Sequence, residues 1–160
     1  MYVARNLSLV IAALVLLGAC SGKSENSVVA EDDEPQEDPR HERHELMEGV
    51  GKAAKPVGKM LKGEIDYDAE VVMTSLQTWH DASTDLGELF PVGSETGMDT
   101  EAAPAIWEDR PGFEAAITEF RKSVEAAMAA APTTLEAAKP VVGPVFQTCK
   151  GCHDSYRIED

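Results

Sequence analysis

The sequence predicts an all-α domain built as a four-helix bundle. Four segments place apolar residues at spacings of three and four, which is the pattern of helices that bury one face. No segment shows the alternation of a half-buried strand, and no hairpin turn signal or internal repeat stands out. Most links between the four segments are short, as they are between neighbouring helices of a bundle.

The first forty residues precede this domain and indicate export. Arg5 is followed by an apolar run over residues 7–17, which is shorter than the roughly 20 residues of a bilayer span and typical of a secretory signal. Leu17-Gly18-Ala19-Cys20 resembles the lipobox of bacterial lipoproteins. We therefore expect residues 1–19 to be a lipoprotein signal peptide, and a lipid on Cys20 to anchor the protein to a bacterial membrane at its periplasmic face. An ordinary signal peptide or an uncleaved anchor is the alternative.

Residues 20–40 predict an acidic, disordered tether between Cys20 and the helical domain, which is expected over residues 41–160. The run Glu31-Asp32-Asp33-Glu34 is followed by two prolines, and such a segment cannot bury a core. A docking site for a basic partner is the alternative. The formal charge of the whole chain is −15, which excludes an electrostatic surface for nucleic acid and would repel anionic membranes. Membrane attachment therefore has to come from lipid.

The first two helices are expected over residues 41–62 and from Asp66 or Asp68 onward. Gly63 closes the first helix, and Pro56 should bend or locally disturb it. Either aspartate can cap the second helix. The apolar stripe of the first helix is Leu46, Met47, Val50, Ala54, Val57 and Leu61. The stripe of the second is Val72, Leu76, Trp79, Ser83 and Leu86.

The third helix should stop before Pro132, and Thr133 or Thr134 can cap the fourth. Pro140 and Pro144 predict a kink in the fourth helix, or a regular part that begins later. The third stripe is Phe113, Ile117, Phe120, Val124, Met128 and Ala131. The fourth is Leu135, Val142, Val145, Cys149, Cys152 and Tyr156.

One connection, from Gly87 to Ala103, is long and contains Pro91, Gly93 and Gly97. Connections of that length are often functional. It could pack over the edge of a cofactor held between the helices.

The sequence Cys149-Lys150-Gly151-Cys152-His153 near the C-terminus is a C-x-x-C-H haem attachment motif. On a helix the two thiols share one side, where each can add to a haem vinyl group, and the histidine can bind the iron. Half a zinc site, a thioredoxin-type redox pair and a structural disulfide are alternatives, but no second cysteine pair or βαβ pattern accompanies the motif. Lipid on Cys20 and haem on the other two would account for all three cysteines.

Further motifs accompany the haem attachment sequence. They are Arg43-x-x-x-Met47, Leu89-Phe90-Pro91-x-Gly93-Ser94, Ile106-Trp107-Glu108-Asp109 with Phe113, and Cys149 to Arg157 as a whole. With them, residues 41–157 resemble the cytochrome c′ family, the class II c-type cytochromes. Attachment of haem near the C-terminus is itself characteristic of that class. Pro140 and Pro144 depart from the alanine-rich final helix that is usual in the family.

The resemblance implies an antiparallel bundle, often a homodimer, with one covalently bound haem c per chain and pentacoordinate, high-spin iron. In it, Cys149 and Cys152 form the thioether attachments and His153 is the axial ligand of the iron. Arg157 matches the arginine beside this imidazole, and the spacing of four residues independently places it on the same helical side.

On the other wall, the resemblance gives Arg43 a contact with a haem propionate, which the adjacent His44 could also reach. Met47 falls where the family places a bulky side chain over the distal face of the iron. We expect an apolar pocket wall made by Met47, Val50, Ala54, Phe90 and Trp107, although a plain core role for Trp107 stays open.

Such a pocket gives dioxygen few hydrogen-bond donors, so we expect the iron to bind nitric oxide, with carbon monoxide hindered by crowding. The alternative is an electron carrier with Met47 as sixth iron ligand and an unidentified redox partner. Catalysis ranks last, because no distal histidine is evident to activate peroxide. The sequence therefore predicts a binding or electron-transfer protein rather than an enzyme.

Overall fold

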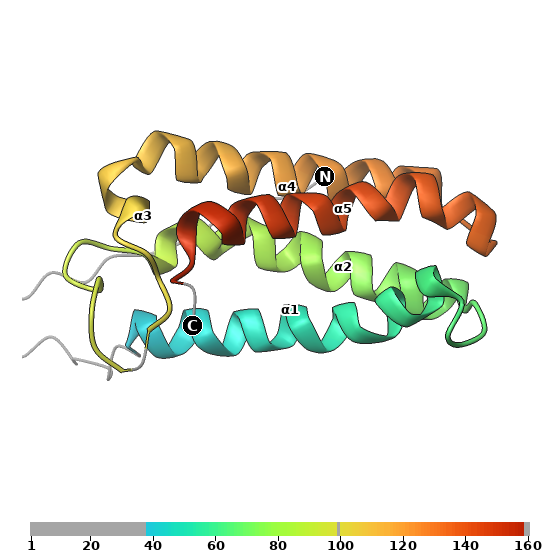
Figure 1. Cartoon of the computed structure of the whole chain (residues 1–160), viewed down its shortest axis with the longest axis horizontal. Coiled ribbons are helices and arrows are strands. Elements are labelled where there is room, and N and C mark those ends of the chain that lie inside the picture. The colour runs from blue at the N-terminus through green and yellow to red at the C-terminus, as the bar shows by residue number, and fades with distance from the viewer. Residues whose placement is uncertain (1–37, 99, 159–160) are drawn as a thin grey trace, which may run out of the picture. The chain divides into compact units, whose positions relative to one another are not determined.

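The computed structural model describes residues 38–98 and 100–158, and within these ranges it forms helices without a named β strand, as predicted (Figure 1). The four long helices are α1 (Pro39–Lys62), α2 (Ala69–Asp85), α4 (Arg110–Ala130) and α5 (Leu135–Tyr156). Between α2 and α4 the chain forms two short elements, the 3₁₀ helix η1 (Leu86–Leu89) and α3 (Ala105–Glu108). The predicted signal peptide, Cys20 and almost all of the tether lie outside the described residues.

The long helices form an antiparallel four-helix bundle, which confirms the predicted architecture. Neighbouring helices in the chain run in opposite directions, and the connection between α2 and α4 closes one end of the bundle (Figure 1). Helix α4 packs against both α2 and α5, and α1 packs against α2, whereas α1 and α5 form the weakest of the four contacts between neighbouring long helices. The loosely packed seam of the bundle therefore lies between α1 and α5. No helix in the described part of the chain is long and apolar enough to cross a membrane.

Most predicted helix boundaries hold because the capping side chains are in place. The Asp68 carboxylate accepts hydrogen bonds from the backbone of Glu70 and Val71 at the start of α2, and the Thr134 hydroxyl accepts one from Ala137 at the start of α5. Gly63 ends α1 with φ at 74°, a left-handed conformation that suits glycine. Helix α1 begins two residues earlier than predicted, because Asp38 caps it.

The third long helix also begins earlier than its apolar stripe. Asp109 caps α4 by accepting a hydrogen bond from Gly112 N at 3.2 Å, and Pro111 fits the first turn, where its missing N–H costs nothing. A Cβ on Gly112 would lie 2.0 Å from Asp109 Oδ2 and 2.6 Å from the Tyr156 hydroxyl. Glycine at this position therefore lets the cap, α4 and the end of α5 meet.

The prolines do not break the helices. Helix α5 runs without interruption from Leu135, so the expectation that its regular part begins later is wrong. Pro140 and Pro144 lie on one exposed side of α5, where water can bond the carbonyl groups that lose their helical partners. The buried residues Ala138, Val142 and Val145 lie on the opposite side and hold the helix against the core. Helix α1 likewise continues through Pro56.

The core fills the bundle unevenly. All five residues of the stripe predicted for the second helix are buried, as predicted. Val72, Leu76 and Trp79 pack in one cluster with Val57, Val124 and Val145. By contrast, Leu46, Met47 and Val50 of α1 and Cys149 and Cys152 of α5 are only partly buried. These residues belong to the seam between α1 and α5, so the core stops where a cavity begins.

Candidate functional site

A cavity of about 490 Å³ opens in the seam between α1 and α5. This volume falls in the range of roughly 300–1,000 Å³ that is common for ligand and cofactor pockets. Its lining is mostly apolar, and α4 and α2 form its floor. The apolar and aromatic lining residues include Met47, Val50, Ala54, Trp79, Leu86, Phe90, Ile106, Phe113, Ile117, Phe120 and Phe146.

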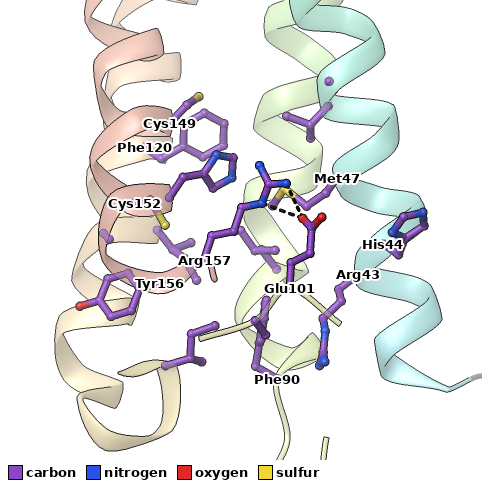
Figure 2. Close-up of a pocket in the computed structure, with 18 of the residues that line it drawn as sticks. Arg43, His44, Met47, Phe90, Glu101, Phe120, Cys149, Cys152, Tyr156 and Arg157 are labelled. Carbon is purple, nitrogen blue, oxygen red and sulfur yellow. Dashed lines mark hydrogen bonds and ion pairs between the residues drawn. The ribbon is translucent and has the colours of Figure 1, made fainter. Parts of the chain in front are cut away.

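The C-x-x-C-H motif borders this cavity from α5. Cys149, Cys152 and His153 all line it, because the spacing of three residues puts both thiols on the side of α5 that faces the seam. Figure 2 shows both cysteine side chains on this wall, with Met47 on α1 across from them. Neither cysteine is in a disulfide. The structure therefore brings the three predicted attachment and ligand residues to one cavity.

The surroundings hold these groups in their uncharged forms. Burial raises the pKa of Cys149 to about 11 and also raises that of Cys152. Burial, followed by the positive charge of Arg157, lowers the pKa of His153, so the neutral imidazole that can bind a metal is favoured. Two thiols, a neutral imidazole and an apolar cavity between helices are the features that a covalently bound haem requires. The residues present fit the group that the motif predicts.

The opposite wall comes from α1 and the long connection. Four of the five predicted wall residues line the cavity, namely Met47, Val50, Ala54 and Phe90. Trp107 does not line it: its ring packs against Phe90 with centroids 6.0 Å apart, and its Nε1 donates to Pro91 O at 3.2 Å. Trp107 therefore supports the wall from behind. His44 borders the cavity and is exposed.

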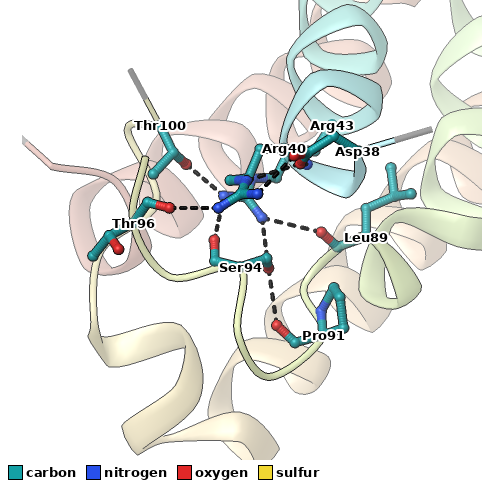
Figure 3. Close-up of polar contacts among 8 residues, drawn as sticks. All are labelled: Asp38, Arg40, Arg43, Leu89, Pro91, Ser94, Thr96 and Thr100. Carbon is teal, nitrogen blue, oxygen red and sulfur yellow. Dashed lines mark hydrogen bonds and ion pairs between the residues drawn. The ribbon is translucent and has the colours of Figure 1, made fainter. Parts of the chain in front are cut away.

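Arg43 lines the cavity, but its guanidinium is engaged with the long connection (Figure 3). Only 5% of the residue is exposed. It donates to Ser94 Oγ at 2.9 Å and Ser94 O at 2.7 Å, and also to Leu89 O at 3.2 Å and Thr100 Oγ1 at 2.6 Å. It also lies over the Phe90 ring, 5.0 Å from the centroid. The contact with a propionate stays a prediction, and the structure adds a second role in holding the connection.

A second arginine holds the same connection from the α5 side. Arg157 borders the cavity, and its Nε donates to Glu101 Oε2 at 2.6 Å. This bond lowers the pKa of Glu101. Ala103 N donates to Tyr156 O at 3.0 Å beside the ion pair, which fastens the end of α5 to the connection.

Sequence reasoning missed Glu101 and the contacts of Ser94 with Arg43. Both involve residues more than 50 positions apart in the chain, so no local spacing could reveal them. The expectation that the connection covers a cofactor edge is consistent with the structure, because Phe90, Thr100 and Glu101 all border the cavity. One arginine from α1 and one that directly follows α5 hold this connection in place.

Comparisons with known proteins agree with the geometry of the site. The family described as Cytochrome C′ matches residues 38–157. Cytochrome c′ of Rhodopseudomonas palustris (strain ATCC BAA-98 / CGA009) is 39% identical over 151 residues, which cover 93% of this chain and 94% of that protein. A solved structure of cytochrome c′ from Rhodopseudomonas palustris is 37% identical, with a TM-score of 0.75, over 78% of this chain and 99% of that one. A nitric oxide complex of a mutant cytochrome c prime from Alcaligenes xylosoxidans is 25% identical, with a TM-score of 0.66, over 76% of this chain and 94% of that one.

Proposed function

Because this chain belongs to the cytochrome c′ family, we propose that it binds nitric oxide at a pentacoordinate, high-spin haem iron and takes part in electron transfer. The cofactor of the family is haem c, which is attached covalently, and this chain has the two cysteines for the attachment. When bound, haem c supplies an iron that alternates between ferrous and ferric states and can accept an axial ligand. The observation that carries the proposal is the apolar wall on α1 that faces the motif across the cavity.

On the α5 side we assign each residue of the motif a role toward haem. Cys149 and Cys152 would hold the haem through thioether bonds, and His153 would supply a nitrogen ligand to its iron. Support comes from the common cavity that all three line. Arg157 adds a positive charge on the same side.

On the α1 side the residues select by size and polarity. Met47, Val50 and Ala54 carry no hydrogen-bond donor in their side chains, and Phe90 closes the wall with a ring. Dioxygen gains from a distal donor, whereas nitric oxide binds ferrous haem strongly without one. The nitric oxide complex of the Alcaligenes xylosoxidans protein supports the same chemistry in a relative. We therefore propose nitric oxide as the preferred diatomic ligand, with carbon monoxide hindered by the crowded wall.

Anaerobic titration of the ferrous protein with nitric oxide tests this function. We expect the Soret band to change and to reach its end point at about one nitric oxide per haem. Carbon monoxide under the same conditions should bind more weakly. An unchanged Soret band at excess nitric oxide would contradict the proposal.

An electron carrier with six-coordinate iron is the second candidate, and one observation favours it. Met47 lines the same cavity as His153 from the opposite helix, so its thioether is placed to compete for the iron. Relatives named cytochrome c-554 and cytochrome c-556 are 35% and 31% identical to this chain. A sharp low-spin alpha band in the ferrous spectrum, together with a methionine-to-iron charge-transfer band, would favour this candidate over gas binding.

We propose binding and electron transfer rather than catalysis, because the wall on α1 offers no buried base. His44 is the histidine nearest to that wall in sequence, and it is exposed at the border of the cavity. Activation of peroxide needs a positioned proton acceptor over the iron. Incubation of the ferric protein with peroxide and a chromogenic donor should give turnover no faster than free haem.

The location of the protein is also a proposal. The lipobox-like sequence before Cys20 supports lipidation and attachment to the periplasmic face of a bacterial membrane. Such an anchor would suit capture of a membrane-permeable gas or contact with a membrane-bound redox partner. After signal cleavage, Cys20→Ala should move the protein from the membrane fraction to the soluble fraction, and its persistence in the membrane would refute the anchor.

We further propose a homodimer, which sedimentation of the matured protein would test.

A further inference from the structure

The ion pair between Glu101 and Arg157 lies at the border of the cavity. The Arg157 Nε and Nη2 atoms are each 2.6 Å from Glu101 Oε2. Figure 2 shows the two side chains meeting in the space between α5 and α1. About half of each side chain is exposed, so the pair is at the mouth of the cavity rather than in the core. Because both residues line the cavity, a haem bound there would lie close to this ion pair.

The backbone holds both residues in register independently of their side-chain charges. Ala102 and Arg157 form an isolated antiparallel bridge. Ala103 N donates to Tyr156 O at 3.0 Å, and Ile158 N donates to Glu101 O at 2.8 Å. Replacement of the Glu101 carboxylate with an amide removes a charge and leaves these backbone hydrogen bonds available. The effect of the charge can therefore be separated from the effect of the fold.

Arg157 follows His153 by four residues, and the backbone connects them directly. Arg157 N donates to His153 O at 3.1 Å where α5 ends. The guanidinium that Glu101 holds borders the same cavity as His153. Asp154, the carboxylate next to His153 in the chain, instead forms an ion pair with Lys150 on the surface. Glu101 is thus a carboxylate that is bonded directly to the arginine beside the ligand.

We propose that Glu101 is a positioning residue for the haem iron: its carboxylate holds the Arg157 side chain beside His153 and neutralises the positive charge of Arg157. A cation near the iron favours the ferrous state, because ferric iron carries one more positive charge. Glu101 therefore lowers the reduction potential below the value that the iron would have without this carboxylate. This inference rests on the covalent haem of the family and not on nitric oxide binding, so it holds for five-coordinate or six-coordinate iron.

Spectroelectrochemical titration of the matured haem protein tests the proposal. Glu101→Gln should raise the potential, which means that the ratio of ferrous to ferric protein at a fixed ambient potential increases several-fold. A tenfold increase would correspond to about 59 mV for one electron. In a background of Arg157→Gln, the same change at Glu101 should have less than half of this effect, because the carboxylate is then no longer held at the cavity. This dependence on Arg157 is what distinguishes positioning from a simple charge effect.

Glu114→Gln is the matched control. Glu114 Oε1 accepts a hydrogen bond from Arg110 Nε at 2.8 Å in another exposed Arg–Glu pair, and neither residue lines the cavity. Glu114→Gln should change the reduction potential much less than Glu101→Gln does. If Glu101→Gln does not mature with haem, Glu101→Asp replaces it, since it keeps the charge but shortens the reach, and it should cause a smaller rise. The proposal fails if the change at Glu101 lowers the potential, if it matches the control, or if its effect is equal with and without Arg157.

Discussion

Replacement of Arg43 with methionine should destabilise the protein by freeing the long connection. Methionine keeps an unbranched stem but donates no hydrogen bond, so the oxygen atoms of Ser94, Leu89 and Thr100 lose their donor. The sequence resemblance alone, which assigns Arg43 to a propionate, gives no reason for this effect on the connection. The stability of the variant therefore tests the second role of Arg43, which is to hold the long connection in place.

The magnitude follows from which of these hydrogen bonds are buried. The two bonds to Ser94 are buried, and a bond to a charged group contributes about 1.5–3 kcal/mol. The bonds to Leu89 and Thr100 are partly buried, so water can replace them at little cost. The variant no longer buries a charged group, and the desolvation cost that is thereby removed offsets part of the loss. We expect a net decrease of about 3 kcal/mol in the free energy of unfolding.

Urea unfolding followed by circular dichroism at 222 nm measures this effect. With a slope of about 2 kcal/mol per molar urea, the midpoint should fall by about 1.5 M. Arg40→Met is the control, because Arg40 is partly exposed and its bond to the connection is a single one, to Thr96 O at 2.7 Å. Its midpoint should remain almost unchanged. Equal midpoints for the two variants would refute the role of Arg43 as the residue that holds the connection.

The other predictions concern packing, coordination and thiol chemistry. Gly112→Ala should cost about 1–3 kcal/mol in thermal unfolding, because its Cβ would lie 2.0 Å from Asp109 Oδ2, whereas Gly143→Ala in α5, with nothing within 4 Å, should be neutral or stabilising. Met47→Leu should leave the ferrous absorption spectrum unchanged if the iron is pentacoordinate, and a switch from low to high spin would reveal Met47 as a ligand. In the folded chain before haem attachment, alkylation of Cys149 by iodoacetamide should be slow at pH 7 and accelerate up to about pH 11, since burial raises its pKa to that value and the thiolate is the reactive form. Fast alkylation at pH 7 would contradict the burial of this thiol.

The parts of the fold that the sequence predicts well are those set by local physics. The stripe from Val72 to Leu86 and the caps at Asp68 and Thr134 depend on neighbours within a few residues, and each is in place. The expectation that the regular part of α5 begins later was wrong because the cost of a proline depends on whether the lost hydrogen bonds face water. That depends on how the helix packs against its neighbours.

In the candidate site, too, local spacing predicts some features and only the packing of distant segments determines the others. Cys149, Cys152 and His153 reach one cavity because their spacing on a helix decides it. The partner of Arg157 does not follow from spacing, because Glu101 meets it only after the connection has packed against α5. Trp107 belongs to a motif of the resemblance, and only packing shows that it lies behind Phe90 rather than in the wall.

The absorption spectrum of the purified ferrous protein tests the central claim most directly, because it reports attachment, spin state and coordination number together. We expect a haem c spectrum with the broad bands of high-spin, five-coordinate iron. A sharp low-spin alpha band, or a colourless protein from cells with a working haem attachment system, would contradict it.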